Sequence, residues 1–115
     1  MDRPRVEKYL PLTPTVFDIL LSLADGEKHG YAILQAVNAA DRALRAGTLY
    51  RALSRLLEQD LVEESLRHPA ASMDDERRRY YRITLLGRRV LKAEVARLEQ
   101  QVLGARAKNL FPERS

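Results

Sequence analysis

The 115-residue sequence predicts one mainly helical α+β domain, in which three helices precede a β-hairpin and one long helix follows it. Four segments place apolar residues at the spacing of an amphipathic helix, whereas aromatic and β-branched residues concentrate in one short segment after residue 78. Apolar residues make up 45% of the chain, which indicates a folded domain rather than a disordered tail.

The first 12 residues contain two prolines and mixed charges, and we expect residues 1–12 to form an irregular arm. Thr13 precedes Pro14, an arrangement typical of a helix N-cap followed by the first helical residue. Apolar spacing then predicts a first helix over residues 14–24, which ends at a turn of sequence Asp-Gly-Glu-Lys.

A second helix is predicted from Gly30 to about residue 40. We expect His29, directly before it, to act as a turn or helix-capping group. A metal site is not expected, because neither His29 nor His68 has a further histidine or cysteine at ligand spacing. The expected apolar face of this helix consists of Tyr31, Ile33, Leu34 and Val37.

The third helix, predicted over residues 48–59, divides into an apolar and a polar face. At 100° per residue, Thr48, Arg51 and Arg55 lie together on the solvent face, and Tyr50 lies at the edge of the apolar stripe. Tyr50 therefore fits either half-buried packing or a hydrogen bond to phosphate. The apolar stripe consists of Leu49, Leu53, Leu56 and Leu57.

The two arginines of the third helix are one turn apart, so both could donate bidentately to guanine bases. The alternative is a solvated helix face, with Arg55 paired to Glu58 or Gln59. Thr48 fits two roles that the sequence does not separate, a helix N-cap and a hydrogen-bond donor to phosphate.

A β-hairpin is predicted from strands over residues 61–66 and 79–84, joined by a long polar connection over residues 67–77. Alternation along the second strand points Tyr81 and Ile83 inward. Acidic residues at 74–76 are expected to pair with nearby arginines when no phosphate is bound. The candidate contacts of the hairpin with phosphate or the minor groove are Arg77, Arg78, Arg79, Tyr80 and Arg82.

The last helix is predicted over residues 85–108 and would be about 36 Å long at 1.5 Å per residue. It is longer than the globule that the preceding residues can form, about 30 Å across. Part of its apolar seam must therefore pack on another chain or in a groove of its own chain. We expect dimerisation through Leu91, Val95, Leu98 and Val102.

Charge is distributed unevenly along the chain. Seven basic residues and no acidic residue fall between Arg77 and Lys92, a local charge of +7 against +4 for the whole chain. Such a basic surface attracts a polyanion. Sixteen of the 20 basic residues are arginine, whose guanidinium suits phosphates and base edges.

The sequence also argues against several classes of function. Without cysteine there is no disulfide, thiol nucleophile or cysteine-containing metal centre. No nucleophile motif, glycine-rich phosphate loop or paired-carboxylate motif is present, so we expect neither an enzyme nor a cofactor. No apolar run approaches the roughly 18 residues that cross a bilayer, and we expect a cytoplasmic protein that does not bind membranes.

Three helices, a hairpin and a further helix, with arginines outward on the third helix and on the second strand, are typical of a winged helix-turn-helix. Three sequence blocks also resemble the signature blocks of PadR-family transcriptional regulators, of the short type with one C-terminal helix. The resemblance spans about residues 12–103. The blocks are His29–Ile33, Gly47–Leu56, and Arg79–Thr84 followed by Gly87.

This resemblance implies a homodimer that binds double-stranded operator DNA, usually as a repressor released by a small molecule or another signal. It implies that Gly47 to Tyr50 open the recognition helix, with Thr48 and Tyr50 near the DNA backbone. The expected organisation is an arm (1–12), a DNA-binding domain (13–84), and a dimerisation helix with a tail (85–115). The alternative is a winged-helix module that binds a partner protein and no specific DNA.

Overall fold

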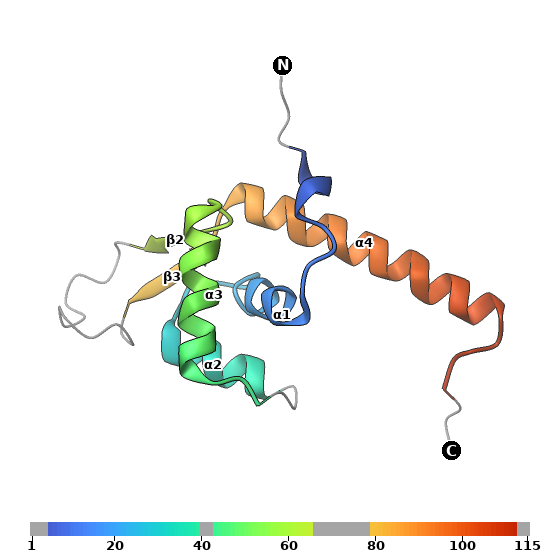
Figure 1. The fold of residues 1–115 in the computed structure, drawn as a ribbon, viewed down its shortest axis with the longest axis horizontal. Helices are drawn as coiled ribbons and strands as arrows, with labels where there is room; N and C mark the ends of the chain where they lie inside the picture. The colour runs from blue at the N-terminus through green and yellow to red at the C-terminus, as the bar shows by residue number, and fades with distance from the viewer. Residues whose placement is uncertain (1–4, 40–42, 66–78, 113–115) are drawn as a thin grey trace.

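The computed structural model describes residues 5–39, 43–65 and 79–112, and Figure 1 shows their arrangement. A short 3-10 helix and three α-helices precede a hairpin that lies at one side of the fold, and a long fourth α-helix crosses the top of the view (Figure 1). The elements in chain order are η1 (Val6–Tyr9), α1 (Pro14–Ser22), β1 (Lys28–His29), α2 (Gly30–Asn38), α3 (Ala46–Glu58), β2 (Val62–Ser65), β3 (Tyr80–Ile83) and α4 (Leu85–Ala107). The predicted order of helices, hairpin and final helix is confirmed.

The helix starts follow from local capping chemistry. Thr13 Oγ1 accepts a hydrogen bond from the Val16 amide at 3.2 Å, and Pro14 is the first residue of α1, as predicted. His29 caps α2, because its Nδ1 accepts from the Ala32 amide at 3.0 Å. Thr84 caps α4 in the same way, with Oγ1 accepting from the Gly87 amide at 2.9 Å.

The sheet has three strands in the order β1-β3-β2, and both pairs are antiparallel. The predicted hairpin is present, with Val62 opposite Ile83 and Ser65 opposite Tyr80. The sequence reading missed the third strand, Lys28–His29, which pairs with Tyr81 and Tyr80. Two residues are too short to show a period-2 pattern, so only the tertiary contact reveals this strand.

One apolar core lies between the helices and the sheet, and the leucine stripe predicted for α3 belongs to it. Tyr31 does not, since its side chain is 51% exposed, and its assignment to the apolar face of α2 is wrong. The outer position of Tyr31 leaves the buried side of the short α2 to Ile33 and Val37. The buried apolar residues are Ile19, Leu20, Leu23, Ile33, Val37, Leu49, Leu53, Leu56, Leu61, Val62, Tyr81, Val90 and Leu91.

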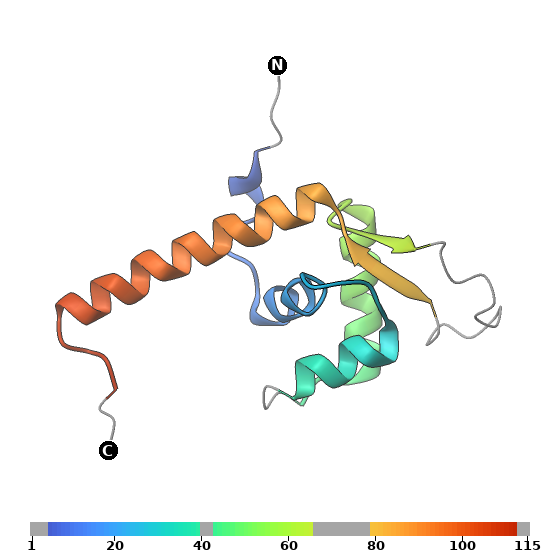
Figure 2. The same ribbon diagram turned by 180° about the vertical axis from the view of Figure 1, so that it is seen from behind.

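Helix α4 has two different halves. The first half covers α1 and the sheet, while the second half extends beyond the rest of the described chain in both views (Figures 1 and 2). Leu91, predicted as part of the dimerisation seam, is buried in the core of its own chain. Val95 and Val102 are 46% and 44% exposed. No helix in the described residues is long and apolar enough to cross a membrane.

The segment before α1 is more ordered than expected. We predicted an irregular arm over residues 1–12, but Val6–Tyr9 form η1, which packs on α4. The Leu12 amide donates to Oε2 of Glu94 at 3.0 Å, so the segment is tied to the long helix. A contact over 82 positions in sequence leaves no local signal, and this explains the wrong expectation.

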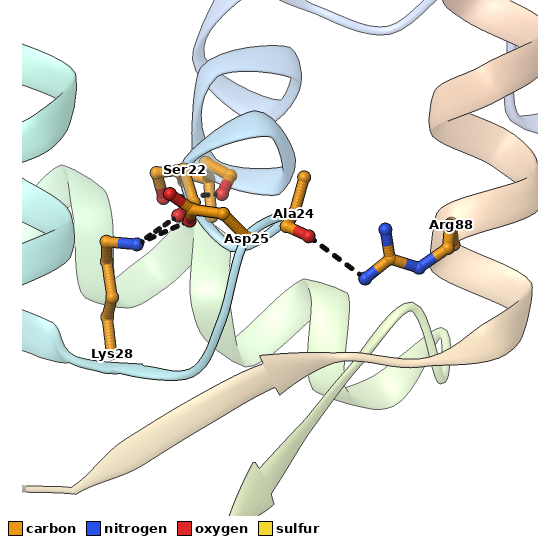
Figure 3. Close-up of polar contacts among 6 residues, drawn as sticks. Ser22, Ala24, Asp25, Lys28 and Arg88 are labelled. Atoms are coloured by element: carbon orange, nitrogen blue, oxygen red, sulfur yellow. Dashed lines mark hydrogen bonds and ion pairs between the residues drawn. The ribbon is translucent and has the colours of Figure 1, made fainter.

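A cluster of polar contacts joins the end of α1 to α4 (Figure 3). Lys28 Nζ donates to the Ser22 carbonyl at 2.6 Å and to Asp25 Oδ1 at 2.9 Å, and this hydrogen bond lowers the pKa of Asp25. The Arg88 guanidinium donates to the Ala24 carbonyl at 3.1 Å. Arg88 of the basic stretch therefore orients α4 on the turn after α1.

Candidate nucleic-acid interface

Helix α3 presents the candidate recognition surface. Leu49, Leu53 and Leu56 are buried on one side, and Thr48, Arg51 and Arg55 are exposed on the opposite side, as the periodicity predicts. An Arg51 guanidinium nitrogen donates to Thr48 Oγ1 at 3.3 Å, so these two side chains are already adjacent.

Neither arginine of this face has an acidic partner among the residues that the structure describes, and no ion pair joins Arg55 to Glu58. The solvated-face alternative with an Arg55–Glu58 pair is therefore not the arrangement seen. The two arginines lie one turn apart and are not paired with any carboxylate of the described residues. An incoming anion can therefore bind them without displacing a carboxylate.

The start of α3 differs in one detail from the prediction. Thr48 is the third helical residue, so its expected N-cap role is wrong. Arg45 occupies the cap position and its side chain makes no capping hydrogen bond. The helix begins two residues earlier than predicted because Ala46 and Gly47 complete its first turn. The first-turn amides and the positive end of the helix dipole therefore lie beside Thr48, as in helix termini that bind phosphate.

Tyr50 is half-buried and its ring lies against Gly30 of α2. A methyl group at Gly30 would collide with the Tyr50 hydroxyl in its present position, so the glycine allows this close helix–helix contact. Of the two roles that the sequence left open for Tyr50, the structure supports half-buried packing between α2 and α3.

Gly47 is exposed in the first turn of α3. A methyl group built there has only the Arg51 guanidinium within 4 Å, at 3.7 Å. The protein itself therefore has no steric need for glycine at this position, although glycine costs helix stability. The absence of a side chain leaves room for something outside the protomer to approach the backbone.

The described part of the hairpin carries three of its predicted contacts: Arg79 and Arg82 are exposed, and Tyr80 is half-buried with its ring edge-on to His29 at 5.4 Å. Arg77 and Arg78 lie outside the described residues, as do the acidic residues at 74–76 expected to pair with them.

The hairpin arginines are paired across the sheet. Arg82 Nε lies 2.7 Å from Oε2 of Glu63, its direct neighbour on β2, and Arg79 lies 3.2 Å from Oε2 of Glu64. The sequence reading missed these partners, although the hairpin register could have shown that Glu63 faces Arg82. Exposed pairs of this kind contribute about 0–1 kcal/mol, so a phosphate can replace either carboxylate at small cost.

A groove of about 610 Å³ separates α3 from residues 8–16. Arg51 and Arg55 line one side and Lys8 lines the other. The sequence placed Lys8 in an arm and gave no sign that it lies near α3, because only the docking of this segment on α4 brings the two together. Among the described residues there is no cluster of three histidine or acidic side chains that could hold a metal ion.

The helical order, the three-stranded sheet and the exposed arginine face of the third helix define a winged-helix protein of the kind that binds nucleic acid. Residues 19–93 match the family model described as the transcriptional regulator PadR-like family, and the chain belongs to this family. The predicted resemblance to PadR-family regulators is thereby confirmed. No curated protein sequence matches the chain.

Solved structures show the same fold. A PadR-family transcription regulator from hypervirulent Clostridium difficile R20291 aligns with a TM-score of 0.64 at 24% identity, over 80% of this chain and 96% of that one. A PadR-family transcriptional regulator from Eggerthella lenta DSM 2243 aligns with a TM-score of 0.61 at 26% identity, over 94% and 87%. A mutant of Lactococcus lactis ZitR aligns with a TM-score of 0.66 at 21% identity, over 98% and 70%.

Proposed function

We propose that this protein binds double-stranded operator DNA sequence-specifically, with α3 in the major groove. The observation that carries the proposal is the exposed face of α3, where Arg51 and Arg55 lie one turn apart and have no carboxylate partner in the part of the chain that the structure describes. A guanidinium in the major groove can donate two hydrogen bonds to guanine, which no other base accepts in the same geometry. Thr48 and the first-turn amides of α3 are suited to the adjacent phosphate.

In this proposal the hairpin supplies the second contact. Arg79 and Arg82 exchange Glu64 and Glu63 for phosphate oxygens, which adds affinity and salt dependence rather than sequence specificity. Arg77, Arg78 and Tyr80 remain predicted contacts of the same hairpin. For Tyr50 the proposal keeps a hydrogen bond from the phenol to phosphate as a secondary role, in addition to its packing on Gly30.

The proposed functional unit is a homodimer formed along the second half of α4. Val95, Val102 and Leu103 are 44–49% exposed there, and a second copy would cover this apolar surface. Leu98 is half-buried on the same helix, while Leu91 lies in the core of the protomer. A two-fold axis across α4 would place two α3 helices on successive major grooves, about 34 Å apart, over a palindromic site.

Bound at a promoter, such a dimer would repress transcription by blocking the polymerase, and an effector that favours a different spacing of the two α3 helices would relieve it. The second candidate is a winged-helix module that binds a protein and recognises no DNA sequence. DNA is favoured because Arg51 and Arg55 form no ion pair within the described residues, although α3 also carries the exposed Glu58 one turn further along.

Arg51→Ala is expected to weaken binding to the selected operator by about 5- to 150-fold, the equivalent of about 1–3 kcal/mol for one bidentate contact. Binding to random DNA should fall much less. The operator is first selected from genomic fragments with purified protein at about 150 mM salt, and affinities are then measured by fluorescence anisotropy. Lys108→Ala, an exposed lysine that follows α4, is the control. Equal losses on operator and random DNA would reduce Arg51 to a phosphate contact, and no preferred fragment would favour the protein-binding alternative.

Gly47→Ala separates folding from DNA binding. Since the added methyl group meets no crowded atom, the free energy of unfolding should stay constant or rise by up to about 1 kcal/mol. Operator affinity should fall by about 1–3 kcal/mol because the methyl group would clash with a closely approaching DNA backbone. Denaturant unfolding and operator titration measure the two quantities. Unchanged affinity would show that DNA does not approach the start of α3.

Val102→Asp is expected to convert the dimer into monomers, because it buries a carboxylate at the centre of the proposed interface. Sedimentation velocity measures the change. Gln100→Asp, on the opposite face of the same helix turn, should leave the dimer intact. A dimer that persists in Val102→Asp would place the interface elsewhere than on this half of α4.

A further inference from the structure

We infer that the groove between α3 and residues 8–16 binds a small molecule with one anionic group and an apolar body, and that this ligand excludes DNA from α3. The groove has a volume of about 610 Å³. Sites for small organic ligands have volumes of about 300–1,000 Å³, so a molecule of two or three fused or linked rings would fit.

The charge of the groove selects an anion. Lys8 approaches from the N-terminal segment, and Arg51 and Arg55 approach from α3. No acidic residue is among the described residues that line it, so the three cations are not neutralised within the groove. Hydroxyl groups such as that of Thr48 add hydrogen-bond donors beside the guanidinium of Arg51.

The body of the ligand must be apolar because the interior of the groove is apolar. Leu12 and Val16 line it from the N-terminal side and Ala52 lines it from α3, and all three are half-buried. An inorganic anion would contact the cations and leave these side chains facing water. An anion attached to a hydrophobic body satisfies both parts of the lining at once.

The N-terminal wall of the groove is held in place before any ligand arrives. The Leu12 amide is bonded to the buried Glu94 carboxylate, and Lys8 Nζ lies over the Tyr9 ring, 5.2 Å from its centroid. A wall that is already positioned loses little conformational entropy on binding, which favours a specific site over an accidental crevice.

The groove and the proposed DNA surface share two residues. A ligand anion held by Arg51 and Arg55 would neutralise the side chains that α3 presents to base edges, so ligand and operator would compete for the same protomer. This competition depends on the proposed function, whereas the existence of the ligand site does not. Competition of this kind requires no change in the spacing of the two α3 helices.

The site can be tested with 8-anilinonaphthalene-1-sulfonate, a fluorescent anion with an apolar body, on the full chain. N-phenyl-1-naphthylamine, which lacks the sulfonate, is the matched neutral probe. Binding is measured by fluorescence titration, and the site is mapped by changes in the ¹H–¹⁵N spectrum. Lys8→Ala and Arg55→Ala are each expected to weaken sulfonate binding by about 3- to 10-fold. Lys108→Ala, on an exposed lysine remote from the groove, is expected to change nothing.

The expected spectral changes cluster at residues 8–16 and 48–61, with little effect of any variant on the neutral probe. Changes confined to the exposed apolar half of α4, or equal affinity in Lys8→Ala and wild type, would overturn the proposal. It would also be overturned if inorganic phosphate displaced the sulfonate probe at the probe's own concentration, since the groove would then be a phosphate contact only. Thermal unfolding followed by circular dichroism confirms that each variant is folded.

Competition is measured separately by titrating the probe in the presence of the selected operator. The apparent dissociation constant of the probe should rise in proportion to the operator concentration. Probe and operator bound together would overturn the exclusion of DNA. If the protein selects no operator at all, the proposed function fails while the titrations without DNA still decide whether the groove binds the anion.

Discussion

Gly87→Ala is expected to lower the free energy of unfolding by about 3 kcal/mol, the upper part of the range for overpacking a tight contact. A methyl group at Gly87 would collide with the carbonyl oxygen of Leu61 and would lie 2.9 Å from Cγ1 of Ile83. The first of these is a backbone atom between α3 and β2, which side-chain rotation cannot move away. The amide of Gly87 also donates the capping hydrogen bond to Thr84, so a shift of the residue would weaken the start of α4.

Gly104→Ala is the matched control, because it makes the same chemical change in the same helix. No atom lies within 4 Å of a methyl group at Gly104, and alanine is the better helix former. The free energy of unfolding of this variant should therefore rise by up to about 1 kcal/mol. Urea unfolding of both variants measures the difference, and a similar response at the two positions would show that the contact of Gly87 with Leu61 does not limit stability.

Glu94→Ala is expected to lower the free energy of unfolding by about 3 kcal/mol, the lower end of the cost of breaking a buried ion pair. The Glu94 side chain is 2% exposed and accepts three hydrogen bonds. They come from the Leu12 amide at 3.0 Å and from two nitrogens of Arg97 at 2.6 and 2.9 Å. Arg97 is partly exposed and can turn to water, which keeps the loss from being larger.

Two further substitutions identify the cause of that loss. Glu94→Gln keeps the shape of the side chain and one acceptor for the Leu12 amide. Its free energy of unfolding should therefore fall less than that of Glu94→Ala. Glu99→Ala, an exposed glutamate of the same helix, should stay within about 0.5 kcal/mol of wild type. Chemical denaturation compares the three variants, and equal stability of Glu94→Ala and Glu99→Ala would contradict the role of the carboxylate in holding residues 8–12 on α4.

The same carboxylate should make stability depend on pH. Hydrogen bonds from Arg97, together with the Leu12 amide, lower the pKa of Glu94 below its ordinary value of 4.5 even though burial acts in the opposite direction. The folded state therefore binds this proton less readily than the unfolded state. The stabilisation is complete above pH 4.5 and is lost as the pH falls through the lowered pKa. The difference in the free energy of unfolding between wild type and Glu94→Gln should therefore decrease as the pH falls below 4.5.

Much of the fold and of the α3 surface could be predicted because the signals are local. Thr13 with Pro14 marks the start of α1, and Thr84 marks the start of α4. The leucine spacing in α3 predicts both the buried stripe and the exposed positions of Arg51 and Arg55. Helix periodicity and capping depend on residues three or four positions apart, so the sequence contains them directly.

Two of the features that escaped prediction join distant parts of the chain. The strand at Lys28–His29 exists through pairing with β3, and Leu12 is bonded to Glu94 across 82 positions in sequence. Tyr31 has apolar spacing but lies outside the core, because the face of α2 that packs on the core is formed by Ile33, Leu34 and Val37.

Local information in the chain determines which segments become helix or strand and which arginines face outward, since both follow from spacing within one element. The tertiary structure determines which residues of other elements these side chains contact. It pairs Arg82 with Glu63, and it packs Leu91 inside the protomer while Val102 stays exposed. It also places Lys8 opposite Arg55 across one groove. Such contacts depend on how the packed elements approach one another in space. The spacing of residues along the sequence does not predict the distance between residues on different elements.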